Sequence, residues 1–270
     1  MNDDMPPVHG PVAVPRIDAS VPHSARFWNY LVGGKDNFEA DRAAAAVVLE
    51  TVPSLALIAR SGREFLGRAV RFLTAEAGIR QFLDIGTGIP TANNTHEVAQ
   101  RVAPDARIVY VDNDPIVLVH ARSLLTSTPE GATDFIDADV RDPDLILREA
   151  ARTLDFSRPV GIMLVGILNF VTDDAQARAL VARLLAAVPA GSYLVVQHPA
   201  SEDAALVEAT RQWSEMGAEP LVCRSRDEVA RYFDGLVLLE PGVVTLNEWR
   251  PEATTGTDVV PSYAAVGRKP

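Results

Sequence analysis

The chain has 270 residues, of which 47% are hydrophobic and 23% are charged. This composition supplies enough apolar side chains for one full hydrophobic core. The formal net charge is −11. The positive residues are scattered among carboxylates, so the sequence lacks the basic face with which proteins bind phosphate-rich surfaces. We therefore expect neither nucleic acid nor a membrane among its partners.

The single cysteine, Cys223, can form neither an internal disulfide nor a thiolate metal cage. The N-terminal residues are acidic and proline-rich, which is unlike a secretory signal or a transit peptide. The longest apolar run, residues 161–171, is too short to cross a bilayer. These features predict a cytoplasmic protein without a metal centre, whose residues 1–20 form a flexible tail.

Residues 24–77 have a helical pattern throughout, and we expect residues 21–77 to form a helical N-terminal cap. The expected helices cover residues 24–31, 36–51 and 54–77, with breaks at Gly33-Gly34 and at Pro53. Glycine and proline at these breaks are typical of the turns between helices.

From residue 78 to residue 270 the pattern changes to strands that alternate with helices. Strands are expected at 79–85, 107–111, 132–136, 160–165 and 192–197, and helices at 95–102, 115–125, 143–154, 173–188, 202–216 and 225–233. This alternation is typical of parallel βαβ units. Three further apolar runs, 236–239, 243–247 and 263–266, have no long helix between them and should pair antiparallel. The sequence therefore predicts one α/β domain, compact with the cap.

A glycine-rich turn, Asp84-Ile85-Gly86-Thr87-Gly88, ends the first expected strand. Open α/β sheets bind ligands at this edge. Glycines leave room for a ligand, and their N–H groups can face a carboxylate. The Asp84 carboxylate can accept hydrogen bonds from an ammonium group. Taken alone, the motif is also compatible with an ordinary tight turn.

Two more acids follow the next two strands. Asp112 ends the second strand, where nucleotide-binding folds place a carboxylate against ribose hydroxyls. Asp139 follows the third strand and can accept from an adenine amino group. Each could be a turn or cap residue, but the ordered set of three is more specific than any member.

The set of Asp84, Gly86, Gly88, Asp112 and Asp139 resembles class I S-adenosylmethionine (SAM)-dependent methyltransferases. More narrowly, residues 27–42 together with 86–91 resemble the S-adenosyl methyltransferase family of unknown substrate, found mainly in actinobacteria. The resemblance covers about residues 20–268. It implies a Rossmann-like, seven-stranded, mostly parallel sheet with an antiparallel C-terminal hairpin, and SAM as the cofactor.

The resemblance also implies a cofactor site. Gly86 and Gly88 would contact the methionine part of SAM, Asp112 the ribose, and Asp139 with Val140 the adenine. The remaining expected contacts at this edge are Thr87, Asn113 and Gly166.

One departure concerns the turn, in which Pro90 replaces the usual third glycine. The methionine end of SAM then needs help from elsewhere, and the cap is the candidate. In this hypothesis Arg26 or Lys35 pairs with the SAM carboxylate, Tyr30 packs near the sulfonium, and Gly33 and Gly34 form the turn that folds over the pocket. The alternative is a plain helix–loop–helix with Lys35 in solvent.

His198, after the fifth strand, is the first candidate for a general base. The alternative is a histidine that only fixes the strand end. Asn169, after the fourth strand, could orient a polar acceptor.

The function predicted from these features is SAM-dependent methyl transfer to oxygen or nitrogen of a small molecule. Two alternatives stay open: a SAM-binding sensor or pseudoenzyme that transfers no methyl group, and an NAD(P)-dependent oxidoreductase. The second is disfavoured because Thr91 occupies the third position of the dinucleotide-binding Gly-x-Gly-x-x-Gly pattern. The sequence does not indicate an oligomeric state.

Overall fold

The computed structural model describes residues 17–124, 127–253 and 255–270. Residues 1–16 of the predicted tail and residue 125, the predicted end of one helix, lie outside the described residues.

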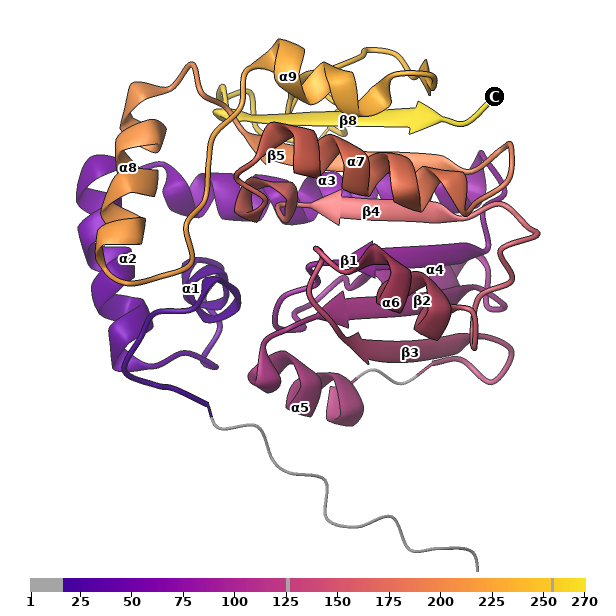
Figure 1. Ribbon diagram of the computed structural model, residues 1–270, viewed down its shortest axis with the longest axis horizontal. Helices are drawn as coiled ribbons and strands as arrows, with labels where there is room; N and C mark the ends of the chain where they lie inside the picture. The colour runs from indigo at the N-terminus through magenta and orange to yellow at the C-terminus, as the bar shows by residue number, and fades with distance from the viewer. Residues whose placement is uncertain (1–16, 125–126, 254) are drawn as a thin grey trace, which may run out of the picture.

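The centre of the molecule is one mixed sheet (Figure 1). Its strands are β1 (Gln81–Ile85), β2 (Arg107–Asp112), β3 (Ala132–Asp137), β4 (Gly161–Val165), β5 (Tyr193–Pro199), β6 (Val237–Leu238), β7 (Val244–Thr245) and β8 (Ser262–Arg268). The order is β3-β2-β1-β4-β5-β8-β6, with β7 also paired to β8. Strands β1 to β5 are parallel, and β8 runs antiparallel to β5. The predicted mostly parallel sheet with a reversed C-terminal part is confirmed.

The prediction of seven strands is corrected to eight among the described residues. Strand β6 pairs with the end of β8 at Gly267, whereas β7 pairs with its beginning at Tyr263, so both occupy the same edge of β8. Pro241, which has no N–H, and Gly242, with a φ of +89°, lie between them. The seventh sheet position is therefore filled by two short strands instead of one.

Helices cover both faces of the sheet and the end at which the parallel strands finish (Figure 1). They are α1 (Ser24–Leu31), α2 (Glu39–Thr51), α3 (Leu55–Ala75), α4 (Thr95–Val102), α5 (Pro115–Leu124), α6 (Pro143–Ala150), α7 (Asp174–Ala186), α8 (Ala204–Glu215) and α9 (Arg226–Ala230). Helices α3 and α4 pack in one core, and α6, α7 and α9 pack in another on the opposite face. Helices α1, α2 and α8 lie beyond the carboxyl ends of the parallel strands (Figure 1).

Helix α3 joins the cap to the sheet. Its residues Ala69, Val70 and Leu73 are fully buried and share one core with Phe82 of β1 and Met163 of β4. The cap and the sheet thus share one core. The division into a cap over 21–77 and a sheet domain over 78–270 stays a prediction.

No single helix in the described ranges is long and apolar enough to cross a membrane; α2 and α3 meet that criterion only together, across a bend of 103°.

A buried carboxylate, Asp41, holds α1 and α2 together. Its oxygens accept from the backbone N–H groups of His23 (2.9 Å) and Phe38 (2.8 Å) and from Nε of Arg26 (3.2 Å). The Arg26 guanidinium also donates to the carbonyls of Asp18 and Val21. Arg26 is only 4% exposed, so it is a structural cation of the cap.

The turn after α1 is built around Asn29. Its Oδ1 accepts from the backbone N–H of Asp36 and from Nδ2 of Asn37. Gly33 has a φ of +84°, and a Cβ on Gly34 would lie 2.3 Å from the Asn29 amide. Both glycines are therefore required by the turn itself.

Replacing Arg26 by alanine should destabilise the protein strongly. The change leaves the Asp41 carboxylate buried without its cation, which costs about 3–5 kcal/mol. Chemical denaturation followed by circular dichroism measures the free energy of unfolding. The exposed Lys35→Ala is the control, expected to change it by less than about 0.5 kcal/mol. Equal effects of the two substitutions would contradict this role of Arg26 in the cap.

Candidate functional site

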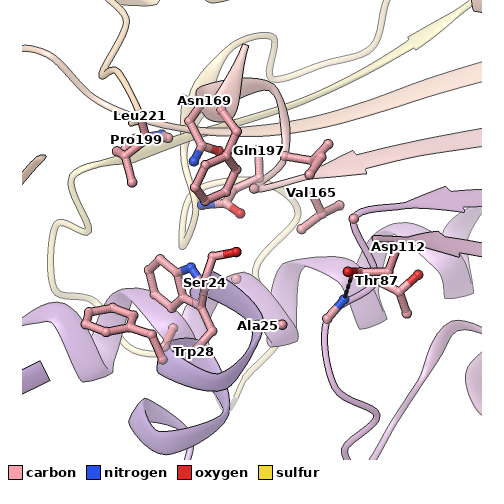
Figure 2. A pocket seen from close by; sticks show the side chains of 18 of the residues that line it. Ser24, Ala25, Trp28, Thr87, Asp112, Val165, Asn169, Gln197, Pro199 and Leu221 are labelled. Atoms are coloured by element: carbon pink, nitrogen blue, oxygen red, sulfur yellow. Dashed lines mark hydrogen bonds between the residues drawn. The ribbon is translucent and has the colours of Figure 1, made fainter. Parts of the chain in front are cut away.

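A single pocket is lined by residues at the carboxyl ends of β1, β2, β4 and β5 and by residues of α1, α3 and α8. Figure 2 shows Ser24 and Trp28 of α1 across the pocket from Asn169 and Gln197. Nine of the predicted cofactor residues line it: Asp84, Gly86, Thr87, Gly88, Asp112, Asn113, Asp139, Val140 and Gly166. The structure thus brings together the acids and glycines that the sequence placed at successive strand ends.

Asp84 is a buried carboxylate at the end of β1. Its side chain is 3% exposed, and Oδ2 accepts from the Thr95 hydroxyl at 2.6 Å. Burial raises the pKa of Asp84 from 3.8 to about 6, against the lowering effects of Thr95 and of the Arg63 guanidinium. At neutral pH Asp84 is therefore a negatively charged carboxylate that is poorly solvated.

Asp112, at the end of β2, is the partner of the glycine turn. Its Oδ2 accepts from the Gly88 N–H at 2.8 Å (Figure 2), and its Oδ1 accepts from the Asp114 N–H at 3.0 Å. Burial raises the pKa of Asp112, while the two backbone hydrogen bonds lower it. Asp112 thus lies buried at the pocket wall and fixes the turn at the same time.

The backbone N–H groups of the glycine turn already donate hydrogen bonds to acceptors within the protein. Gly86 and Thr87 donate to the carbonyl of Val111 at 2.8 and 3.3 Å, and Gly88 donates to Asp112. The prediction that these N–H groups face a ligand carboxylate is therefore not supported. Gly88 has a φ of +66°, and a Cβ at this residue would have no heavy atom within 4 Å, which leaves open space beside the turn.

Asp139 lies after β3 and is partly exposed. Its Oδ2 accepts from Arg141 Nη1 at 2.8 Å and from Asn113 Nδ2 at 3.4 Å. Arg141 also donates to Glu219 at 2.6 Å and to the carbonyl of Phe170. This network closes the β3 end of the pocket.

Arg63 of α3 is a pocket residue that the sequence reasoning missed. Its Nη2 donates to the carbonyls of Ala92 and Asn93 at 3.3 and 3.2 Å, whereas its Nε is buried without a partner. Burial lowers the pKa of Arg63, and the Asp84 carboxylate opposes that shift. No local pattern distinguishes it from Arg60, one turn earlier on the same helix, which is exposed.

The cap faces the pocket, but with a different side of α1 from the one predicted. Arg26, Tyr30, Gly33, Gly34 and Lys35 do not line the pocket, and Tyr30 and Lys35 are exposed. The residues that do face it include Ser24, Trp28 and Val32, which are four positions apart and so share one side of the helix. The proposed pairing of Arg26 or Lys35 with a ligand is therefore corrected.

His198 is also not where a general base is needed. It is fully buried and does not line the pocket. Its Nε2 accepts from Arg224 at 2.9 Å, so Nδ1 carries the hydrogen and donates to the carbonyl of Pro199. Burial lowers the pKa of His198 to about 3. The structural alternative, a histidine that fixes the strand end, fits these contacts.

Twelve apolar side chains line the rest of the pocket, and we call the space that they line the chamber. They come from α1, α2, α3, β4, α8 and the segments after β4 and α8: Phe27, Trp28, Val48, Leu55, Ile58, Leu66, Val165, Ile167, Phe170, Leu206, Trp213 and Leu221. The rings of Phe27 and Trp213 meet edge to face at 4.7 Å, which joins α1 to α8. No motif in the sequence indicated that α8 belongs to the site.

The described residues hold no cluster of three or more histidine, cysteine or acidic side chains arranged to bind a metal ion.

A family model described as S-adenosyl methyltransferase matches residues 11–270. The chain belongs to this family. Its cofactor is SAM, and the protein is a SAM-dependent methyltransferase. This assignment decides against the NAD(P)-dependent alternative.

Solved structures agree with the assignment. A DUF574 family protein from Streptomyces avermitilis is 44% identical, with a TM-score of 0.91 over 94% of this chain and 100% of its own. A candidate methyltransferase from Thermobifida fusca is 43% identical, with a TM-score of 0.86 over 93% and 96%. An O-methyltransferase family protein from Burkholderia thailandensis, 16% identical over 86% of this chain and 60% of its own, shares the fold with a TM-score of 0.54. No curated protein matches the chain.

The buried Asp84 should make this methyltransferase less stable as the pH rises. Its pKa is higher in the folded chain than in the unfolded one, so the folded state holds more protons between pH 3.8 and about 6. Across that window the free energy of unfolding should fall with rising pH. In Asp84→Asn, which keeps an acceptor for Thr95, the fall should be smaller, and at pH 8 the variant should be more stable by up to about 3 kcal/mol.

Urea denaturation without ligand at several pH values measures the difference. Glu50→Gln removes an exposed carboxylate and serves as the control. Identical pH profiles for Asp84→Asn and the wild type would show that the burial of Asp84 is not costly.

Proposed function

We propose that this S-adenosyl methyltransferase transfers the methyl group of SAM to a nitrogen or oxygen atom of a small, largely apolar acceptor. The observation that carries the proposal is the continuity of one pocket. Buried acids line it at the ends of β1 and β2, and the apolar chamber, which includes residues of α1 and α8, belongs to the same pocket. A cofactor at the acids and an acceptor in the chamber would share one enclosed space.

The residues at the strand ends fit SAM. Asp84 and Asp112 are buried carboxylates with raised pKa values, so a cationic or hydroxyl-bearing ligand would relieve their poor solvation. In this proposal Asp112 holds the ribose, Asp139 with Val140 the adenine, and the open side of Gly88 admits the methionine part. When bound, SAM supplies an electrophilic methyl group on a positively charged sulfur.

The methionine carboxylate of SAM needs a cation, and we assign Arg63 to it. The turn N–H groups are already used, and Arg141 is paired with Asp139 and Glu219. Arg63 lines the pocket near Asp84 and has an unpartnered Nε. Arg63 and Asp84 would then bind the carboxylate and the ammonium group of one amino acid.

The chamber residues would hold the acceptor and exclude water. Apolar walls favour a ligand with apolar surface, and their packing around a fixed volume favours a small molecule over a polymer. Methyl transfer needs little beyond alignment of the nucleophile with the methyl–sulfur bond, and such positioning supplies several kcal/mol. The main task of α1, α3 and α8 is therefore to shape the binding site for the acceptor.

Replacing Arg63 by glutamine should weaken SAM binding about tenfold to hundredfold, because a charge-assisted hydrogen bond is lost. Calorimetry on the purified protein measures the affinity. 5′-Methylthioadenosine, which lacks the amino-acid end, should bind the variant and the wild type equally. The exposed Arg60→Gln, on the same helix, is the control.

Equal losses for SAM and 5′-methylthioadenosine in Arg63→Gln would mean that Arg63 only shapes the pocket. An unchanged SAM affinity would remove Arg63 from the site.

A further inference from the structure

Two side-chain amides, those of Asn169 and Gln197, project into the chamber from the sheet side. Figure 2 shows both extending toward Ser24 and Trp28 of α1. Asn169 follows β4 and Gln197 lies in β5. Asp84 and Asp112 lie in β1 and β2, and Asp139 follows β3. The sheet order therefore puts the amides on one side of the pocket and the acids on the other.

The orientation of the Gln197 amide is fixed by its neighbours. The Ser262 hydroxyl donates to the carbonyl of His198, so toward Gln197 it can only accept, and Nε2 of Gln197 donates to it at 2.7 Å. The Oε1 atom consequently points the other way, into the gap between Gly166 and Gly62 of α3, where a Cβ would lie 3.1 and 3.7 Å from it. No described residue donates to this oxygen.

Asn169 has a buried carbonyl oxygen without a partner. Its side chain is 5% exposed, and no described group donates to Oδ1. The backbone at this residue is held by a hydrogen bond from Val222 to the Asn169 carbonyl at 2.9 Å. A buried acceptor left unpaired is costly, so such a group calls for a specific donor. A ligand in the chamber that carries N–H or O–H groups would supply it.

The pocket offers no free general base beside these amides. Its titratable residues within the described ranges are Arg63, Asp84, Asp112, Asp139, Arg141 and Glu219. Asp139 and Glu219 are paired with Arg141, and Asp84 and Asp112 accept from Thr95 and from backbone N–H groups. Amide oxygens accept hydrogen bonds but do not take up a proton at neutral pH.

We propose that the acceptor is an apolar molecule that carries a primary or secondary amine, bound in its neutral form. This inference rests on the proposed function. Asn169 Oδ1 and Gln197 Oε1 would accept the two N–H groups of a primary amine, or one of these oxygens the single N–H of a secondary amine. The nitrogen lone pair is then left directed at the methyl group. The lone pair forms the N–CH₃ bond as the C–S bond breaks, and the sulfur keeps that electron pair and becomes neutral. The nitrogen takes the positive charge, and its extra proton passes to water.

The surroundings favour an amine over an alcohol. A neutral amine attacks without prior loss of a proton, whereas an alcohol needs a base during the transfer. The apolar walls disfavour a charged ammonium group, because burial penalises the charged form. A carboxylate acceptor would be repelled further by Asp84, Asp112 and Asp139.

The test uses amine, alcohol and carboxylate derivatives of benzene and naphthalene that differ only in the polar group. S-adenosylhomocysteine (SAH) affinity is measured first by calorimetry, and the probes are then titrated into the SAH complex at several pH values. We expect the amines to bind about tenfold tighter than the matched alcohols and carboxylates once they are neutral. Their affinity should rise with pH up to the amine's own pKa, while alcohol binding stays constant.

Substitutions test whether Asn169 and Gln197 are the residues that bind the amine. Asn169→Leu and Gln197→Leu should each weaken amine binding about fivefold or more and leave SAH affinity unchanged. The exposed Gln176→Leu is the control. With SAM in place of SAH, mass spectrometry should detect the N-methylated amine and no methyl ether.

Failure of SAH to bind would overturn both the proposed function and this inference. Normal SAH binding without a preference for amines, or with amine affinities unaffected in Asn169→Leu and Gln197→Leu, would overturn the amine acceptor alone. Formation of a methyl ether from the alcohols would do the same.

Discussion

The structure depends on the burial of carboxylates at the ends of adjacent parallel strands. Asp84 and Asp112 have little access to water, and burial raises the pKa of each. Such groups persist where hydrogen bonds and a ligand make up for the lost solvation. Thr95 and the glycine turn supply part of this, and in our proposal the ammonium and ribose groups of SAM supply the rest.

The cap converts this sheet edge into an enclosed site. Asp41 and Arg26 fix α1 against α2, and the Phe27–Trp213 contact fixes α1 against α8. The result is one space lined both by buried acids and by apolar side chains. The acids on β1, on β2 and after β3 would bind the cofactor, while the uncharged amides after β4 and on β5 would select the acceptor. In this proposal the strand order of the sheet places the residues that bind the cofactor apart from those that select the acceptor.

The fold was largely predictable because its signals are local. Alternating apolar strands and capped helices indicated the parallel sheet, and the strand ends indicated Asp84, Asp112 and Asp139. Residues placed by packing were not predictable. Arg63 and Arg60 lie on the same helix, and only the packing of α3 buries one of them. The side of α1 that faces the pocket and the burial of His198 against Arg224 depend on contacts distant in sequence.

A crystal structure of the SAH complex tests the central claim most directly. We expect the adenosine between Asp112 and Asp139, the amino-acid end between Asp84 and Arg63, and the sulfur directed toward the chamber beside Asn169 and Gln197. Density for the nucleoside under α8 in the chamber, or at any place away from the strand ends, would contradict it.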